Sequence, residues 1–228
     1  MTGRVAIVAG GTGALGQSVV SRFLSTGATV CVPYAVPAEM EALRARVAAA
    51  ARLHTTPSDV TDEAAFGAFV KGVLDAHGRI DILVNGVGGF AGGDLASTTL
   101  AEWNRMLTLN LMPAVIGTRA VLPAMTAAGF GRIVNVASRA VVPPMGGFIA
   151  YTVAKAGVIT LTQALAREVA RGITVNAVLP STMDTPANRR AMPDADRSGW
   201  VSTDAVAEVI AYLASDGAGA VNGAAIPV

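Results

Sequence analysis

Short apolar segments alternate with amphipathic segments along the chain, and this alternation limits the folds open to it. The segments expected to form strands are residues 5–9, 28–32, 52–56, 80–85, 132–137, 173–179 and 224–228. The segments expected to form helices are residues 14–26, 38–51, 62–77, 102–125, 151–171 and 203–214, with a bend at Pro113. Apolar strands separated by helices indicate a parallel sheet covered on both faces. Because crossovers are right-handed, we expect an α/β fold with a doubly wound sheet of about seven strands.

The composition fits one domain with a large buried core. A chain of 228 residues is expected to form a single domain, residues 1–228. Hydrophobic residues make up 52% of the chain and charged residues 14%, which suits a large buried sheet and extensive subunit contacts. The net charge is +1 and there is no basic block. The sequence therefore lacks the electrostatic footprint of a protein that binds nucleic acid or an anionic membrane.

The sequence shows no pattern typical of export, membrane insertion or metal binding. It has no signal-peptide pattern, and its longest charge-free stretch, residues 5–21, is rich in glycine and too short to span a membrane. The single cysteine, Cys31, permits no intrachain disulfide and suits a reducing compartment. His54 and His77 have no partners at metal-ligand spacing. We expect a cytoplasmic protein without a metal site.

A glycine-rich loop connects the first expected strand to the first expected helix. Gly11, Gly13 and Gly16 match the G-x-G-x-x-G pattern, and the match follows a strand and opens a helix. Glycines allow a tight turn and a close approach to a pyrophosphate, while the helix N-terminus offers N–H groups to it. We therefore expect this loop to bind a dinucleotide.

The choice between NAD and NADP stays open in the sequence. The acid that usually binds the ribose 2′-hydroxyl is missing, since the second strand leads into Tyr34 and Ala35 and the first acid after them is Glu39. No carboxylate at that point repels a 2′-phosphate, and no Arg or Lys attracts one. The sequence leans slightly toward NADP.

Tyr151, Lys155 and Ser138 form a candidate catalytic group. Tyr151 and Lys155 are four residues apart on an expected helix and share one face. An ammonium beside a phenol is expected to lower its pKa toward working pH. The chain has only two lysines, Lys71 and Lys155, among 17 basic residues, which indicates a need for a compact charge at Lys155. Such a group protonates an oxygen while a hydride reaches the neighbouring carbon.

Taken together, these motifs resemble the classical type of the short-chain dehydrogenase/reductase family over almost the full length. The resemblance implies a Rossmann-type fold, NAD(P)(H) as cofactor, a dimer or tetramer, and a catalytic tetrad of Asn110, Ser138, Tyr151 and Lys155. It assigns cofactor contacts to Tyr151 and Lys155 and to Gly10, Thr12, Gly13, Ala14, Leu15, Gly16, Tyr34, Asp59, Val60, Asn85, Gly86, Val87, Pro180, Thr182 and Thr185. The chain departs from the family pattern at Ala9, Ala14, Gly86 and Ser181, and none of these departures removes a catalytic group.

A narrower resemblance links residues 88–93 and 179–200 to dihydropteridine reductases of the same superfamily. Those enzymes typically lack the serine, whereas this chain keeps Ser138 and Asn110, which favours a carbonyl or alcohol substrate. We expect hydride transfer between NAD(P)(H) and a small or medium substrate, with Tyr151 as acid–base group and residues 186–200 as a lid. Reduction of a pterin is the alternative, and a non-catalytic nucleotide-binding protein is the alternative from another class. The sequence identifies neither the substrate nor the reaction direction.

Overall fold

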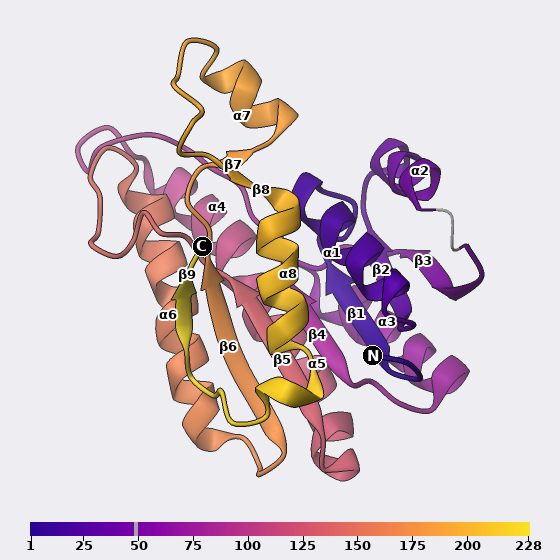
Figure 1. Cartoon of the computed structure of the whole chain (residues 1–228). Helices are drawn as coiled ribbons and strands as arrows, with labels where there is room; N and C mark the ends of the chain where they lie inside the picture. The colour runs from indigo at the N-terminus through magenta and orange to yellow at the C-terminus, as the bar shows by residue number, and fades with distance from the viewer. Residues whose placement is uncertain (48–49) are drawn as a thin grey trace.

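A seven-stranded sheet with parallel neighbours forms the centre of the molecule, which the computed structural model describes for residues 1–47 and 50–228 (Figure 1). Its strands in chain order are β1 (Val5–Ala9), β2 (Thr29–Tyr34), β3 (Leu53–Pro57), β4 (Ile82–Asn85), β5 (Gly131–Val136), β6 (Ile173–Leu179) and β9 (Ala225–Pro227). They lie side by side in the order β3-β2-β1-β4-β5-β6-β9, and every neighbouring pair is parallel. This arrangement confirms the predicted doubly wound α/β fold.

Helices cover both faces of the sheet (Figure 1). One layer contains α1 (Ala14–Ser25), α2 (Pro37–Arg46) and α8 (Thr203–Leu213). The other contains α3 (Glu63–His77), α4 (Leu100–Asn110), α5 (Met112–Ala128) and α6 (Ile149–Glu168). Short 3₁₀ turns lie at Ala50–Arg52 and Asp216–Ala218.

Alternation along the strands divides the apolar side chains between the two faces of the sheet. In β1, Ala6 and Val8 belong to the core beneath α1 and α8, whereas Ile7 and Ala9 belong to the core beneath α3 and α5. Successive side chains of a strand point to opposite faces, so a strand buried on both faces must be apolar throughout. This is the physical reason for the uninterrupted apolar runs in the sequence.

The predicted helix over residues 102–125 is two helices in the structure. Helix α4 ends at Asn110, and α5 begins at Met112, so Leu111 separates them. Pro113 lies in the first turn of α5, where its missing N–H has no helical acceptor to lose. The proline therefore starts a new helix rather than bending an old one.

Other element boundaries also differ from the predicted ones. Helix α2 ends at Arg46, short of the predicted residue 51, and residues 48–49 of that prediction lie outside the described residues. The segment 186–200, predicted from the sequence as a lid with no helix assigned to it, contains helix α7 (Pro186–Ala191). A small two-stranded ribbon of β7 (Met183–Asp184) and β8 (Val201–Ser202) closes that segment at its base.

Two helical stretches are long and apolar enough to span a membrane by length and composition. They are Leu100–Ala128, which Leu111 divides, and Ile149–Glu168. Both pack in the helix layer of this sheet. Core helices of folded domains pass the same test, so the finding is weak support for a membrane span.

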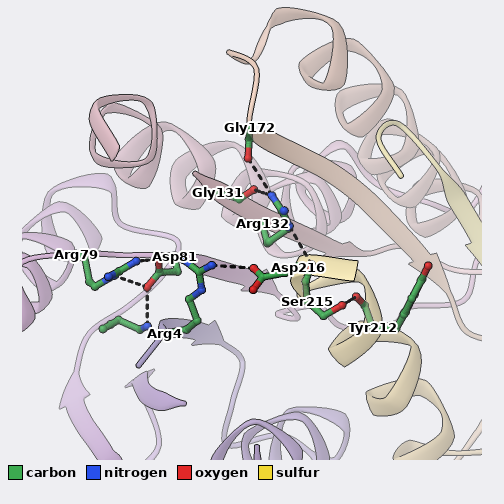
Figure 2. Close-up of polar contacts among 10 residues, drawn as sticks. Arg4, Arg79, Asp81, Gly131, Arg132, Gly172, Tyr212, Ser215 and Asp216 are labelled. Carbon is green, nitrogen blue, oxygen red and sulfur yellow. Dashed lines mark hydrogen bonds and ion pairs between the residues drawn. The ribbon is translucent and has the colours of Figure 1, made fainter. Parts of the chain in front are cut away.

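A polar cluster joins elements at the amino ends of the strands (Figure 2). Asp81 accepts hydrogen bonds from the guanidinium groups of Arg4 at 3.1 Å and Arg79 at 2.6 and 2.8 Å, and from the Val5 N–H at 2.8 Å. Arg4 also pairs with Asp216 at 2.8 Å. The cluster ties the start of β1 to the segment before β4 and to the 3₁₀ turn that follows α8. It lies at the end of the strands opposite the candidate site.

Candidate active site

The predicted site residues converge at the carboxyl ends of the strands. The order of the sheet reverses between β1 and β4, and crevices at such switch points are where open α/β sheets bind ligands. The glycine-rich loop follows β1, Asn85 ends β4, Ser138 follows β5, and Pro180 follows β6. Side chains far apart in the sequence therefore lie together at the carboxyl ends of the strands.

The glycine-rich loop is a tight cradle that side chains would fill. Gly10 has φ +81°, and a Cβ there would lie 2.8 Å from the Gly86 carbonyl carbon. A Cβ at Gly16 would lie 1.9 Å from the Gly10 carbonyl oxygen. Helix α1 begins after Gly13 with no side-chain cap and no acidic residue in its first turn. Its free N–H groups and positive end fit the pyrophosphate of a dinucleotide.

The hydroxyl groups of Tyr151 and Ser138 lie close together, between the start of α6 and the end of β5. Tyr151 lies in the first turn of α6, and Ser138 follows β5 and accepts a hydrogen bond from the Ala140 N–H at 3.2 Å. Burial raises the pKa of Tyr151 above its ordinary value, and its hydrogen bond with Ser138 opposes that shift. The pKa of Tyr151 thus shifts upward, opposite to the lowering that the sequence predicts from the neighbouring ammonium. Desolvation is the largest contribution and outweighs the effect of Ser138. The phenol is therefore protonated at neutral pH.

Lys155 is a buried ammonium beneath the same site. It is 5% exposed, and its Nζ donates to the Val136 carbonyl oxygen at 2.9 Å. Desolvation lowers the pKa of Lys155 to about 8. A buried lysine whose pKa is shifted toward neutral pH is typical of functional sites.

Asn110 lies beside Lys155 at the break between α4 and α5. Its Oδ1 accepts from the Gly89 N–H at 3.1 Å, and its Nδ2 donates to the Met106 carbonyl at 3.1 Å. A Cβ at Gly88 would lie 2.7 Å from Asn110 Oδ1 and 3.0 Å from Lys155 Nζ. Gly88 therefore leaves the space in which the two polar groups approach each other.

The remaining predicted cofactor residues lie along the same edge. Tyr34 ends β2, Asp59 and the buried Val60 follow β3, and Gly86 and Val87 follow β4. Hydrogen bonds from Thr61 lower the pKa of Asp59.

Beyond β6, the predicted contacts lie where the chain leads into α7. The Thr182 carbonyl accepts from the Val201 N–H at 3.0 Å, which joins the two arms of the lid segment. Thr185 is buried and caps α7, accepting from the Asn188 N–H at 3.2 Å. Among the described residues, no group of three or more His, Cys, Asp or Glu side chains could hold a metal ion.

Two features of the site were missed by sequence reasoning. The Thr12 hydroxyl donates to Glu39 Oε2 at 3.0 Å, so the first acid after β2 reaches the glycine-rich loop. Phe90 and Phe148 stand beside Tyr151, with ring centroids 5.2 and 6.1 Å from that of the phenol. Glu39 was visible in the sequence as the first acid after β2, but helix α2 had to be placed before its contact could be inferred.

A family model, related sequences and a solved structure all match this chain over most of its length. The family model for short chain dehydrogenases matches residues 4–196. The chain is 36% identical to (2S)-[(R)-hydroxy(phenyl)methyl]succinyl-CoA dehydrogenase subunit BbsD of Thauera aromatica, covering 96% of this chain and 92% of that protein. It is 35% identical to 3-oxoacyl-[acyl-carrier-protein] reductase FabG of Pseudomonas aeruginosa, covering 100% and 96%. The crystal structure of levodione reductase superposes with a TM-score of 0.93 at 30% identity, covering 100% of this chain and 96% of that one.

Proposed function

Because the chain belongs to the short-chain dehydrogenase/reductase family and is an NAD(P)-dependent oxidoreductase acting on carbonyl or alcohol groups, we propose that Tyr151 is its acid–base group. The observation that carries this proposal is the meeting of Tyr151, Ser138 and the buried Lys155 beside the glycine-rich loop. The substrate is a small or medium molecule, bound beneath the segment 186–200, which acts as a lid.

Tyr151 and Ser138 bind the oxygen of the substrate carbonyl. The cofactor, when bound, supplies the hydride that adds to the carbonyl carbon. Tyr151 delivers its proton to the oxygen as negative charge develops there, and Ser138 donates a hydrogen bond that holds the oxygen in place. The raised pKa of Tyr151 keeps this proton on the phenol until it is needed. In the reverse direction the ionised form of Tyr151 accepts the proton of the alcohol and becomes the neutral phenol.

Lys155 and Asn110 support the phenol. The ammonium stabilises the phenolate that forms when the proton leaves, since opposite charges attract strongly in a buried site. Asn110 binds the Gly89 N–H and approaches Lys155, and we place it in a relay that returns a proton from solvent through Lys155. The segment after β6 supplies Thr185 to the nicotinamide end of the site.

A panel of carbonyl compounds tests this function. Purified protein should oxidise NADH or NADPH, followed at 340 nm, with at least one ketone or aldehyde of small or medium size. The retained Ser138 supports a carbonyl substrate over a pterin. Turnover of quinonoid dihydropterin above every ketone would replace the proposal with the pterin alternative.

We further propose that the cofactor is NAD rather than NADP. The sequence leaned toward NADP because no carboxylate follows β2 directly, but Glu39 in the first turn of α2 bonds Thr12 at the glycine-rich loop. A carboxylate there repels a 2′-phosphate and accepts a hydrogen bond from a ribose hydroxyl. The basic residues later in α2 are engaged elsewhere, since Arg44 bonds Thr55 and Arg46 bonds Ser18.

Binding affinities test the role of Glu39 without reference to turnover. Calorimetry should give a lower Kd for NADH than for NADPH. Glu39→Gln should lower the Kd for NADPH divided by the Kd for NADH roughly tenfold, because it removes the charge that repels the 2′-phosphate. Glu41→Gln, an exposed acid on the same helix, is the matched control and should leave the ratio unchanged. Tighter binding of NADPH by the wild-type protein would contradict the proposal.

We also propose a homo-oligomer, a dimer or tetramer, in the cytoplasm. Helices α5 and α6 are apolar and carry partly exposed faces, which supports their use as subunit contacts. Light scattering coupled to gel filtration should give a mass of two or four times 23.0 kDa. A mass of one chain would contradict the oligomer.

A further inference from the structure

Phe90 and Phe148 form an aromatic wall on one side of Tyr151. The Phe90 centroid lies 5.5 Å from that of Phe148 and 5.2 Å from that of Tyr151, and the Phe90 ring meets the phenol edge-on. The two phenylalanines come from different loops, one after β4 and one before α6. One of the two groups attached to a carbonyl bound at the Tyr151 hydroxyl is therefore within reach of this wall.

Backbone hydrogen bonds fix the wall in place. The Gly93 N–H donates to the Gly147 carbonyl at 2.8 Å, and the Ile149 N–H donates to the Gly93 carbonyl at 3.1 Å. Asp94 closes the following turn by accepting from the Ser97 N–H at 2.8 Å. The ring of Phe90 is thus presented by two loops that hold each other, rather than by a single unsupported loop.

The wall is open toward the solvent side of the site. Phe90 is 64% exposed, although a large aromatic ring normally gains by burial. Val142 and Met145, in the loop before α6, are each 55% exposed. An exposed aromatic ring beside the polar group of Tyr151 indicates a surface that contacts an apolar ligand.

We propose that this wall selects substrates that carry a flat aromatic ring next to the reacting carbon. Aromatic rings pair with one another edge-to-face or with offset faces, and this geometry adds to simple area burial. A saturated ring of the same size gains the area term alone. The inference rests on the proposed function, because it takes the carbonyl to be bound at Tyr151.

A matched pair of ketones tests this selection. Acetophenone and cyclohexyl methyl ketone have the same carbon skeleton and differ in the saturation of the ring. The readout is kcat/KM for acetophenone divided by kcat/KM for cyclohexyl methyl ketone. This ratio in each variant is compared with that in the wild-type protein, which cancels the intrinsic reactivity of the two ketones. Phe90→Ala should lower the ratio about 3- to 10-fold, with the change chiefly in KM.

Two control variants keep the result specific. Phe90→Tyr retains an aromatic ring and should keep the wild-type ratio. Leu100→Ala removes an apolar side chain that is 81% exposed on α4 and should also leave it unchanged. Because Phe90 is largely exposed, its removal should leave the thermal unfolding temperature close to that of the wild-type protein.

The outcomes separate this inference from the proposed function. An unchanged ratio in Phe90→Ala, or wild-type turnover of neither of the two ketones, would overturn the aromatic selection. Turnover of other carbonyl compounds in the wider panel would still support the proposed function. Only a panel without any Tyr151-dependent turnover would defeat both.

Discussion

At the scale of single residues, burial decides the chemistry of the site. Desolvation acts on the two titratable members in opposite directions, raising the pKa of the Tyr151 phenol and lowering that of the Lys155 ammonium to about 8. Both shifts favour the neutral form. In the proposed mechanism the neutral phenol retains the proton used for reduction. The ammonium stays charged at neutral pH and loses its charge as the pH rises through about 8.

The Lys155 ionisation predicts two pH dependences. Reductive kcat/KM should fall as pH rises through about 8, because the charge that stabilises the phenolate is lost. The free energy of unfolding should rise from pH 8 toward 10.5, since the unfolded chain keeps its lysine proton up to the ordinary pKa of 10.5 while the folded chain does not. Chemical denaturation at a series of pH values measures the second effect.

Lys155→Met is the control for that linkage. This variant should lose the stability increase between pH 8 and 10.5, and it should also lose turnover. A wild-type stability curve parallel to that of Lys155→Met throughout this window would show that the folded ammonium is not destabilised by burial.

Residue identities at the site were readable from the sequence, but their environment was not. Spacing alone placed Tyr151 and Lys155 on one helix face, and the structure confirms the helix. The direction of the Tyr151 pKa depends on how deeply the first turn of α6 is buried, which is a property of the whole packing. The contact of Glu39 with Thr12 and the aromatic wall likewise depend on how loops fold against one another.

At the scale of elements, the turn from β1 into α1 depends on the absence of a side chain at one glycine. Gly16→Ala would place its Cβ 1.9 Å from the Gly10 carbonyl oxygen and 2.6 Å from Gly11 Cα, so the backbone must move. We expect a loss of about 1–3 kcal/mol in the free energy of unfolding, measured by urea denaturation without cofactor, together with weaker cofactor binding.

Gly13→Ala is the matched control in the same loop. Its Cβ would meet the Gly10 carbonyl oxygen at an ordinary 3.5 Å, and the φ of −73° suits alanine. Its free energy of unfolding should stay within about 0.5 kcal/mol of the wild-type value. Equal destabilisation by the two substitutions would argue against the close approach at Gly16.

Strong periodic elements were predicted well, and short or crowded ones were not. Strand β1 and strand β6 have the predicted bounds, because continuous apolar runs bounded by glycine or polar residues leave little choice. The break at Leu111 was missed because α4 and α5 continue in nearly one apolar pattern. Helix α7 is too short for its six residues to show a period.

At the scale of the whole molecule, the polar cluster around Asp81 lies at the amino ends of the strands (Figure 2), whereas the candidate active site lies at their carboxyl ends. The Asp81 side chain is 3% exposed and bonds two guanidinium groups and a backbone N–H. Asp81→Ala should lower the free energy of unfolding by about 1–3 kcal/mol, because the buried Val5 N–H and two partly exposed guanidinium groups lose their acceptor. Thermal and urea denaturation measure this change, and kcat/KM should stay near the wild-type value.

Asp216→Ala removes a carboxylate from the same cluster and serves as the comparison. Its side chain is 75% exposed and pairs with Arg4, so its removal should cost below about 1 kcal/mol. A cost equal to that of Asp81→Ala would show that charge, rather than burial, determines the stability of this edge.

The central claim is that Tyr151 protonates the substrate oxygen, and single-turnover kinetics of Tyr151→Phe test it most directly. The variant removes one hydroxyl from the site, and the Kd of NADH, measured by calorimetry, should change by less than about threefold. With cofactor bound and the best ketone of the panel, the rate of NADH oxidation at 340 nm should fall by about 10²- to 10⁴-fold. A rate near that of the wild-type protein would contradict the account.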